Sequence, residues 1–133
     1  IDLGEAQSVD RVVLFPARPV DFPDTPGFGF PERFKIEGST EESFSEPFVI
    51  ADRSAEDFPN PGDEPVEFSI DAKETRYVRV TATKLWERTN DFVFALGEMR
   101  VFSGVDLLSE GKSVSSLDTI DSGRWNRNHL VDG

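Results

Sequence analysis

The sequence predicts an all-β fold, an antiparallel β-sandwich or jelly roll of about eight strands. Apolar and polar residues alternate in six or more short segments, and no segment keeps a helical apolar stripe over three turns. In addition, 9 Pro and 10 Gly are scattered between these segments, where they favour turns. A chain of 133 residues is long enough for one domain with a proper core.

Each expected strand follows from its local pattern. In residues 33–39, Phe34 and Ile36 share one face while charged side chains occupy the other. In residues 76–83, Val78, Val80 and Ala82 take the side that should face the core. Short helical turns are expected at most at residues 55–58 or near the C-terminus. In chain order, the expected strands are residues 8–15, 33–39, 47–51, 66–70, 76–83, 92–96 and 98–102.

Three long connections separate these strands, and they differ in character. Val20 to Pro31 is rich in Pro, Gly and Phe, Asp52 to Pro65 is acidic and proline-rich, and Leu85 to Asp91 contains a Trp. Because alternate strand connections of a sandwich emerge together, we expect the three loops to gather at one end.

Charge and composition exclude several classes of function. There are 26 acidic and 14 basic residues, a net charge of −12, which repels nucleic acid and anionic membrane surfaces. The negative electrostatic field of such a chain suits a neutral ligand, a cation or a basic partner. The alternative is that the acidic charge simply keeps the protein soluble. No apolar stretch approaches the roughly 18 residues of a membrane-spanning helix. With no Cys, the chain has no disulfide and no thiolate zinc site.

Signatures of catalysis are missing from the sequence. It contains no serine-hydrolase elbow, metalloprotease motif, phosphate-binding loop or dinucleotide fingerprint. Gly27 and Gly29 are not followed by a helix that would present its N-terminus to a phosphate. The single histidine, His129, is expected to be structural or exposed. The sequence therefore predicts that the chain is not an enzyme.

Four segments, in order, resemble discoidin domains, also called coagulation factor V/VIII C-type domains, which include the family-32 carbohydrate-binding modules. Arg76 to Val80 is similar to the "aRYVRi" strand of that family and is the most specific match. Phe44 stands near the place of a family tryptophan. The resemblance covers residues 1–104 and is carried by residues 1–4 with 9–14, 34–39, 76–80 and 98–104.

The resemblance implies a galactose-binding-like sandwich that binds a ligand without chemistry. Residues 105–133 are similar to the segment that normally opens such a domain, yet here it follows the last strand. Two interpretations stay open: residues 105–133 complete the body formed by residues 1–104, as in a circular permutant, or they begin a following repeat. If they complete it, their apolar residues should be largely buried: Val105, Leu107, Leu108, Val114, Trp125, Leu130 and Val131.

Sugar-binding members of this family carry an aromatic side chain in the loops at one end. This implies that Trp86 stacks on a sugar ring and that Arg88 and Asn90 hydrogen-bond its hydroxyl groups. The alternative is that Trp86 caps the core beside Phe92. Other candidate ligand residues, each with a structural alternative, are Phe28, Phe30 and Arg18.

A structural calcium ion is a second implication of the resemblance. Many members hold it between an Asp-Gly loop and a glutamate of the closing strand, which correspond here to Asp132 and Glu98. Calcium takes six to eight hard oxygen ligands, of which backbone carbonyls supply several.

The sequence thus predicts a weak binding module for a neutral carbohydrate. We expect it to be part of a larger, exported multidomain protein, periplasmic or extracellular, beside the other domains of its parent chain. The alternative is a structural or protein-interaction module with no sugar ligand.

Overall fold

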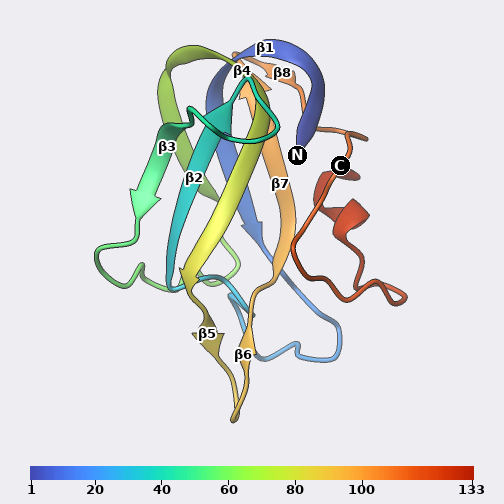
Figure 1. Ribbon diagram of the computed structural model, residues 1–133. Helices are drawn as coiled ribbons and strands as arrows, with labels where there is room; N and C mark the ends of the chain where they lie inside the picture. The colour runs from blue at the N-terminus through green and yellow to red at the C-terminus, as the bar shows by residue number, and fades with distance from the viewer.

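A computed structural model describes all 133 residues, Ile1 to Gly133, and confirms the all-β antiparallel prediction. Six strands form one sheet in the order β3-β2-β4-β1-β7-β8, and β5 and β6 form a separate hairpin (Figure 1). The elements are β1 (Asp2–Pro16), β2 (Arg33–Ser39), β3 (Phe48–Arg53), β4 (Val66–Lys84), β5 (Trp86–Glu87), β6 (Phe92–Val93), β7 (Leu96–Ser103), β8 (Asp106–Leu107) and the 3₁₀ helix η1 (Arg127–Val131).

The large sheet folds over on itself because β1 and β4 are long enough to take part in both layers of the sandwich. The first half of β4 pairs with β1, from Val66 opposite Leu14 onward, whereas its second half pairs with β2. The start of β1 follows β4 into this second layer, since Asp2 pairs with Tyr77. Register shifts in β1 mark the places where it bends between the layers.

Strand β4 corrects the expectation of two separate strands at 66–70 and 76–83. The intervening residues 71–75 contain no Gly or Pro, so the backbone stays extended while it crosses between the layers. Thr75 is buried at this crossing, and its hydroxyl group donates a hydrogen bond of 2.9 Å to the carbonyl oxygen of Lys73.

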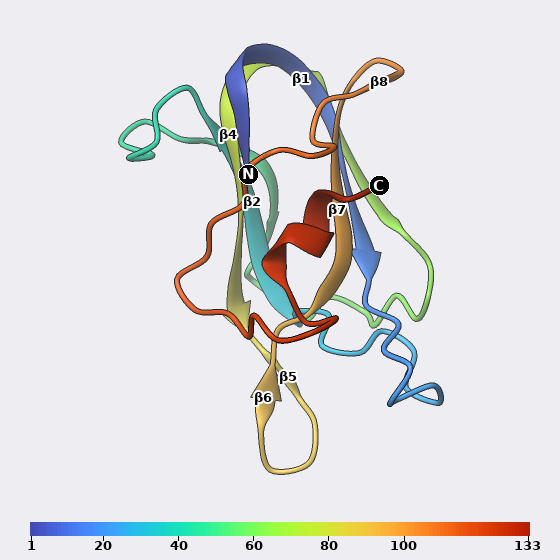
Figure 2. The ribbon, with the colours of Figure 1, turned by 90° about the vertical axis from the view of Figure 1, so that its right-hand side faces the viewer.

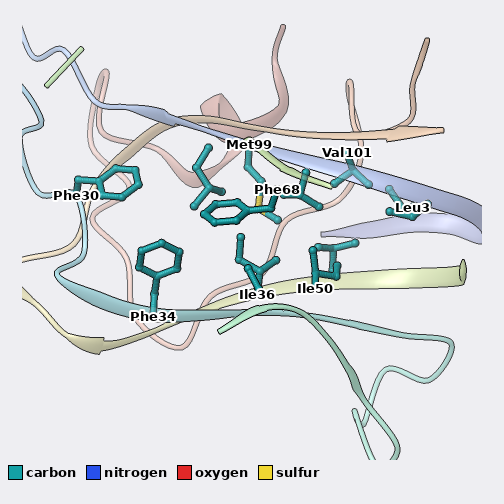
Figure 3. Close-up of a cluster of buried hydrophobic side chains, with 13 residues drawn as sticks. Leu3, Phe30, Phe34, Ile36, Ile50, Phe68, Met99 and Val101 are labelled. Atoms are coloured by element: carbon teal, nitrogen blue, oxygen red, sulfur yellow. The ribbon is translucent and has the colours of Figure 1, made fainter. Parts of the chain in front are cut away.

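The core lies between the two layers and contains side chains from both (Figure 3). Phe34 and Ile36 of β2 enter it from one layer, as expected, and Met99 and Val101 of β7 enter it from the other. Loop residue Phe30 is also part of this core and lies edge-on to Phe34, with ring centroids 5.8 Å apart.

Residues 105–133 run across the open side of the sandwich (Figure 2). Asp2 N–H donates to the carbonyl oxygen of Ser113 at 3.0 Å, and Leu108 and Leu130 pack against the core. Val131 is buried, and Leu107, Val114 and Trp125 are half-buried. The burial expected for Val105 is wrong: this side chain is 93% exposed, because it belongs to the turn between β7 and β8.

No helix in the structure has the length and apolar character needed to cross a membrane.

Candidate ligand-binding end

The three long loops meet at one end of the sandwich, as the sequence predicts (Figure 1). Ala95 N–H donates a 2.9 Å hydrogen bond to the carbonyl oxygen of Gly29, which ties the β5–β6 hairpin to the loop between β1 and β2. Phe58 N–H donates to the Glu32 carbonyl oxygen at 2.7 Å, which fastens the acidic loop beside them. Backbone hydrogen bonds, and not only side-chain packing, therefore hold the three loops together.

One face of the β5–β6 hairpin packs inward against this loop. Trp86 pairs with Val93 across the hairpin. Gly29 has φ +68°, and a Cβ atom at this position would lie 2.7 Å from the Cβ of Ala95 and 3.1 Å from Val93 Cγ1. Only glycine permits this approach, so the hairpin lies directly on the backbone of the loop.

Four aromatic rings form a cluster at this end, centred on Phe28 and called here the Phe28 cluster. The Phe28 ring stacks on Phe22 with centroids 4.8 Å apart and 21° between the planes. Trp86 lies 5.3 Å from Phe28 and Trp125 lies 6.0 Å from it, both tilted. Phe28 is only 2% exposed, whereas the other three rings are half-buried. Phe28 thus supports rings that reach the surface and does not itself face solvent.

The structure places Trp86 on Phe28 and not beside Phe92. Phe92 pairs with Glu87, on the other face of the hairpin from Trp86 and Val93. The alternative that Trp86 caps the core together with Phe92 therefore does not describe this packing. Phe30, another candidate ligand residue, belongs to the core between the layers.

Arg88 and Asn90 lie near the tip of the hairpin. The guanidinium group of Arg88 forms an ion pair with Asp91, with Nε 3.0 Å from Oδ1, and lies 5.4 Å from the centroid of the Phe22 ring. The hydrogen bonds to Asp91 raise the pKa of Arg88 above its usual value. Asn90 is exposed with φ +63°, a turn conformation that asparagine tolerates. The guanidinium group of Arg88 thus lies beside the Phe28 cluster.

Arg18 lies on an open hollow of about 420 Å³, on the side of the acidic loop. Its Nη2 donates a 2.5 Å hydrogen bond to the carbonyl oxygen of Asp63. Glu98, one of the two calcium candidates, lines the same hollow. The full lining is Phe15, Pro16, Arg18, Asp63, Pro65, Gly97 and Glu98.

The two carboxylates proposed as calcium ligands each have a partner within the chain. Glu98 forms a two-pronged ion pair with Arg100, at 2.8 and 3.0 Å, and this raises the pKa of Arg100. Asp132 Oδ2 lies 2.7 Å from His129 Nδ1. The structure contains no group of three or more His, Cys, Asp or Glu side chains arranged to hold a metal ion. A calcium ion would therefore draw most of its oxygen ligands from backbone carbonyls, and calcium binding stays a prediction.

Sequence reasoning did not assign Phe22 or Trp125 to the ligand-binding end. Phe22 lies in a loop with no periodic pattern, and Trp125 reaches Phe28 from the far end of the chain. One signal was available: Phe22, Phe28 and Phe30 lie in a single loop of only twelve residues, Val20 to Pro31, which has to cover apolar rings.

Comparisons with known proteins found no match among family models, curated proteins or solved structures. The resemblance to discoidin domains stays a prediction from the sequence.

Proposed function

We propose that the domain is a non-catalytic binding module for a neutral carbohydrate, held at the loop end beside the Phe28 cluster. In this proposal it serves an exported multidomain protein, and the other domains of that parent chain carry any chemistry.

The observation that supports the proposal most is the position of Trp86. Its indole ring is half-buried on Phe28, at the end of the sandwich where the three loops meet. A sugar ring has an apolar C–H face and a polar rim, so it fits an aromatic ring with a fixed orientation and polar neighbours. Asn90 and Arg88 supply such neighbours on the same hairpin.

The charge of the chain narrows the class of sugar. Arg88 is neutralised by Asp91, and the net charge of −12 disfavours sulfated or phosphorylated glycans. Phe22, Trp86 and Trp125 are half-buried rings that reach the surface, so a sugar bound on them buries little area. The dissociation constant should then lie at about millimolar to tens of micromolar.

Titration calorimetry against a panel of neutral and sulfated oligosaccharides tests the proposal. We expect at least one neutral saccharide to bind the wild type, and Trp86→Ala to abolish its binding while the protein stays folded at the assay temperature, as a melting curve checks. Phe44→Ala is the matched control, because Phe44 is a half-buried aromatic residue that packs on Tyr77 and Arg79, outside the Phe28 cluster. If no neutral saccharide binds, or if Trp86→Ala binds as tightly as wild type, the proposal is wrong.

A further inference from the structure

The β5–β6 hairpin has a second face, opposite the one that carries Trp86. Because Val93 and Ala95 both approach Gly29, the alternation of an extended backbone places Phe92 and Phe94 on the other side. Phe92 pairs with Glu87, and Leu85 alternates with Trp86. These residues define what is called here the outer face of the hairpin: Leu85, Glu87, Phe92 and Phe94.

The outer face is unusually apolar for a solvent-exposed hairpin. Phe92 is 66% exposed, Phe94 is 45% exposed and Leu85 is 37% exposed. None of the three is among the buried residues of the core. Phe has no polar group to satisfy with water, so these rings gain free energy only when another surface covers them.

Two features indicate how a partner would meet this face. Figures 1 and 2 show that the hairpin projects beyond the end of the sandwich, so it is able to enter a recess without a clash from the rest of the domain. Three apolar side chains offer much less than the roughly 800 Å² per partner of a flat, stable interface. Insertion into a recess buries such anchors more completely than contact with a second hairpin does.

Charge decides between a second copy and a different partner. Glu87 lies within the outer face, while Arg88 and Asp91 neutralise one another, so residues 85–95 carry a net charge of −1. Two copies, each with a net charge of −12, repel one another. A protein with Lys and Arg around an apolar recess is attracted by the same field.

We propose that the outer face is the docking surface for a positively charged protein partner, with Phe92 and Phe94 as the anchors that enter its apolar recess. This goes beyond the proposed carbohydrate site, because Trp86 lies on the opposite face of the hairpin. The two sites are therefore separable by mutation.

A synthetic amphipathic helical peptide of Leu and Lys serves as the probe, with a Leu and Glu peptide of equal length as its control. In ¹⁵N–¹H spectra of the full chain, we expect the Lys peptide to shift amide signals of residues 85–95 in a saturable way. Phe92→Ser/Phe94→Ser should weaken this binding at least about tenfold. Val105→Ser, at another exposed apolar side chain, should bind as wild type does.

Several results would overturn the proposal. One is a response spread over the acidic surface that the double variant leaves unchanged; another is equal binding of the Glu peptide. Sedimentation of the wild type as a dimer that the double variant converts to a monomer would assign the face to a second copy. Phe92→Ser alone guards against misfolding: a fall in its melting temperature of more than a few degrees would make Phe92 a structural residue. Loss of sugar binding in Trp86→Ala, with peptide binding retained, separates this test from that of the carbohydrate site.

Discussion

The indole ring of Trp86 rests on the phenyl ring of Phe28, with centroids 5.3 Å apart and 56° between the ring planes. Phe28 is buried and in turn stacks on Phe22. The orientation of Trp86 is therefore set by a ring from a different loop, before any ligand arrives. Such preorganisation reduces the entropic cost of binding a small ligand at an open surface.

Gly29 should be the most sensitive glycine of this end. Gly29→Ala combines a positive φ with a contact of 2.7 Å to the Cβ of Ala95, so we expect it to lower the free energy of unfolding by about 2–5 kcal/mol. Gly62→Ala is the matched control, since Gly62 has φ +64° with nothing within 4 Å of the added methyl group. It should cost only about 1–2 kcal/mol. Urea unfolding measures both free energies. If Gly29→Ala and Gly62→Ala lower the free energy of unfolding equally, the hairpin does not pack tightly on this loop.

Asp57 makes the stability of the acidic loop depend on pH. Hydrogen bonds from Lys84 and Arg33 lower the pKa of Asp57 below its usual value of 3.8. Because the folded-state pKa is depressed, this contribution is fully present above about pH 3.8 and is lost as the pH falls through the folded-state value. The melting temperature of Asp57→Asn should therefore fall less between pH 6 and pH 3 than the melting temperature of the wild type.

The control for this pH experiment is Glu56→Gln on the same loop, since Glu56 forms no ion pair. It should follow the wild-type pH profile. If Asp57→Asn also follows that profile, the ionisation of Asp57 does not contribute to the pH dependence of stability.

Ser109 tests whether residues 105–133 are an integral part of the folded body. Its buried hydroxyl oxygen accepts a hydrogen bond from Val101 N–H at 3.0 Å and the hydroxyl group donates to the Met99 carbonyl oxygen. Ser109→Ala leaves the buried N–H of Val101 without a partner, at an expected cost of about 1–3 kcal/mol. The exposed Ser115→Ala should cost almost nothing. Calorimetric melting compares the two variants.

Truncation after Gly104 tests the same point by removing residues 105–133 altogether. It removes Leu108 and Leu130 from the core surface and the buried Val131, at about 1.5–3 kcal/mol for each fully buried apolar side chain. We expect the truncated chain to lose several kcal/mol or to fail to fold. A truncated chain that melts within a degree of the full chain would mean that residues 105–133 only begin another repeat.

The calcium prediction leads to a thermal experiment. Calcium that binds only the folded state should raise the melting temperature at millimolar concentration, and EDTA should reverse the rise. Arg100 competes for Glu98, with which it forms two hydrogen bonds, so Arg100→Met should enlarge the rise. The same melting temperature with calcium and with EDTA, in both proteins, would eliminate this site.

The strands predicted best from the sequence are those in which apolar and polar residues alternate regularly. The bounds expected for residues 33–39 are those of β2, because Phe34, Ile36 and Gly38 are buried while Lys35 and Glu37 between them are only half-buried. The sequence did not predict the continuity of β4, because the alternation of apolar and polar residues breaks off at residues 71–75. The two-residue strand β5 is too short to leave any periodic signal.

Part of the candidate site was also predictable. That the three loops gather follows from the order of strands in a sandwich. The partners of Phe28 do not follow from any local pattern, since Trp125 reaches Phe28 only after residues 105–133 have crossed the sandwich. Nor does alternation alone show which face of the hairpin is buried. The approach of Gly29 to Ala95 decides that question, and it exists only in three dimensions.

The central claim, that the face of Trp86 binds a neutral sugar, has a direct measurement. The chain has two tryptophans, so an ¹⁵N–¹H spectrum contains two indole N–H signals, and Trp125→Phe assigns them. On titration with a neutral saccharide that binds by calorimetry, the Trp86 signal should shift in a saturable way, with the same dissociation constant. A sulfated saccharide of the same size should leave it in place. If the neutral saccharide saturates the protein while the Trp86 signal does not move, the sugar binds elsewhere and the account is contradicted.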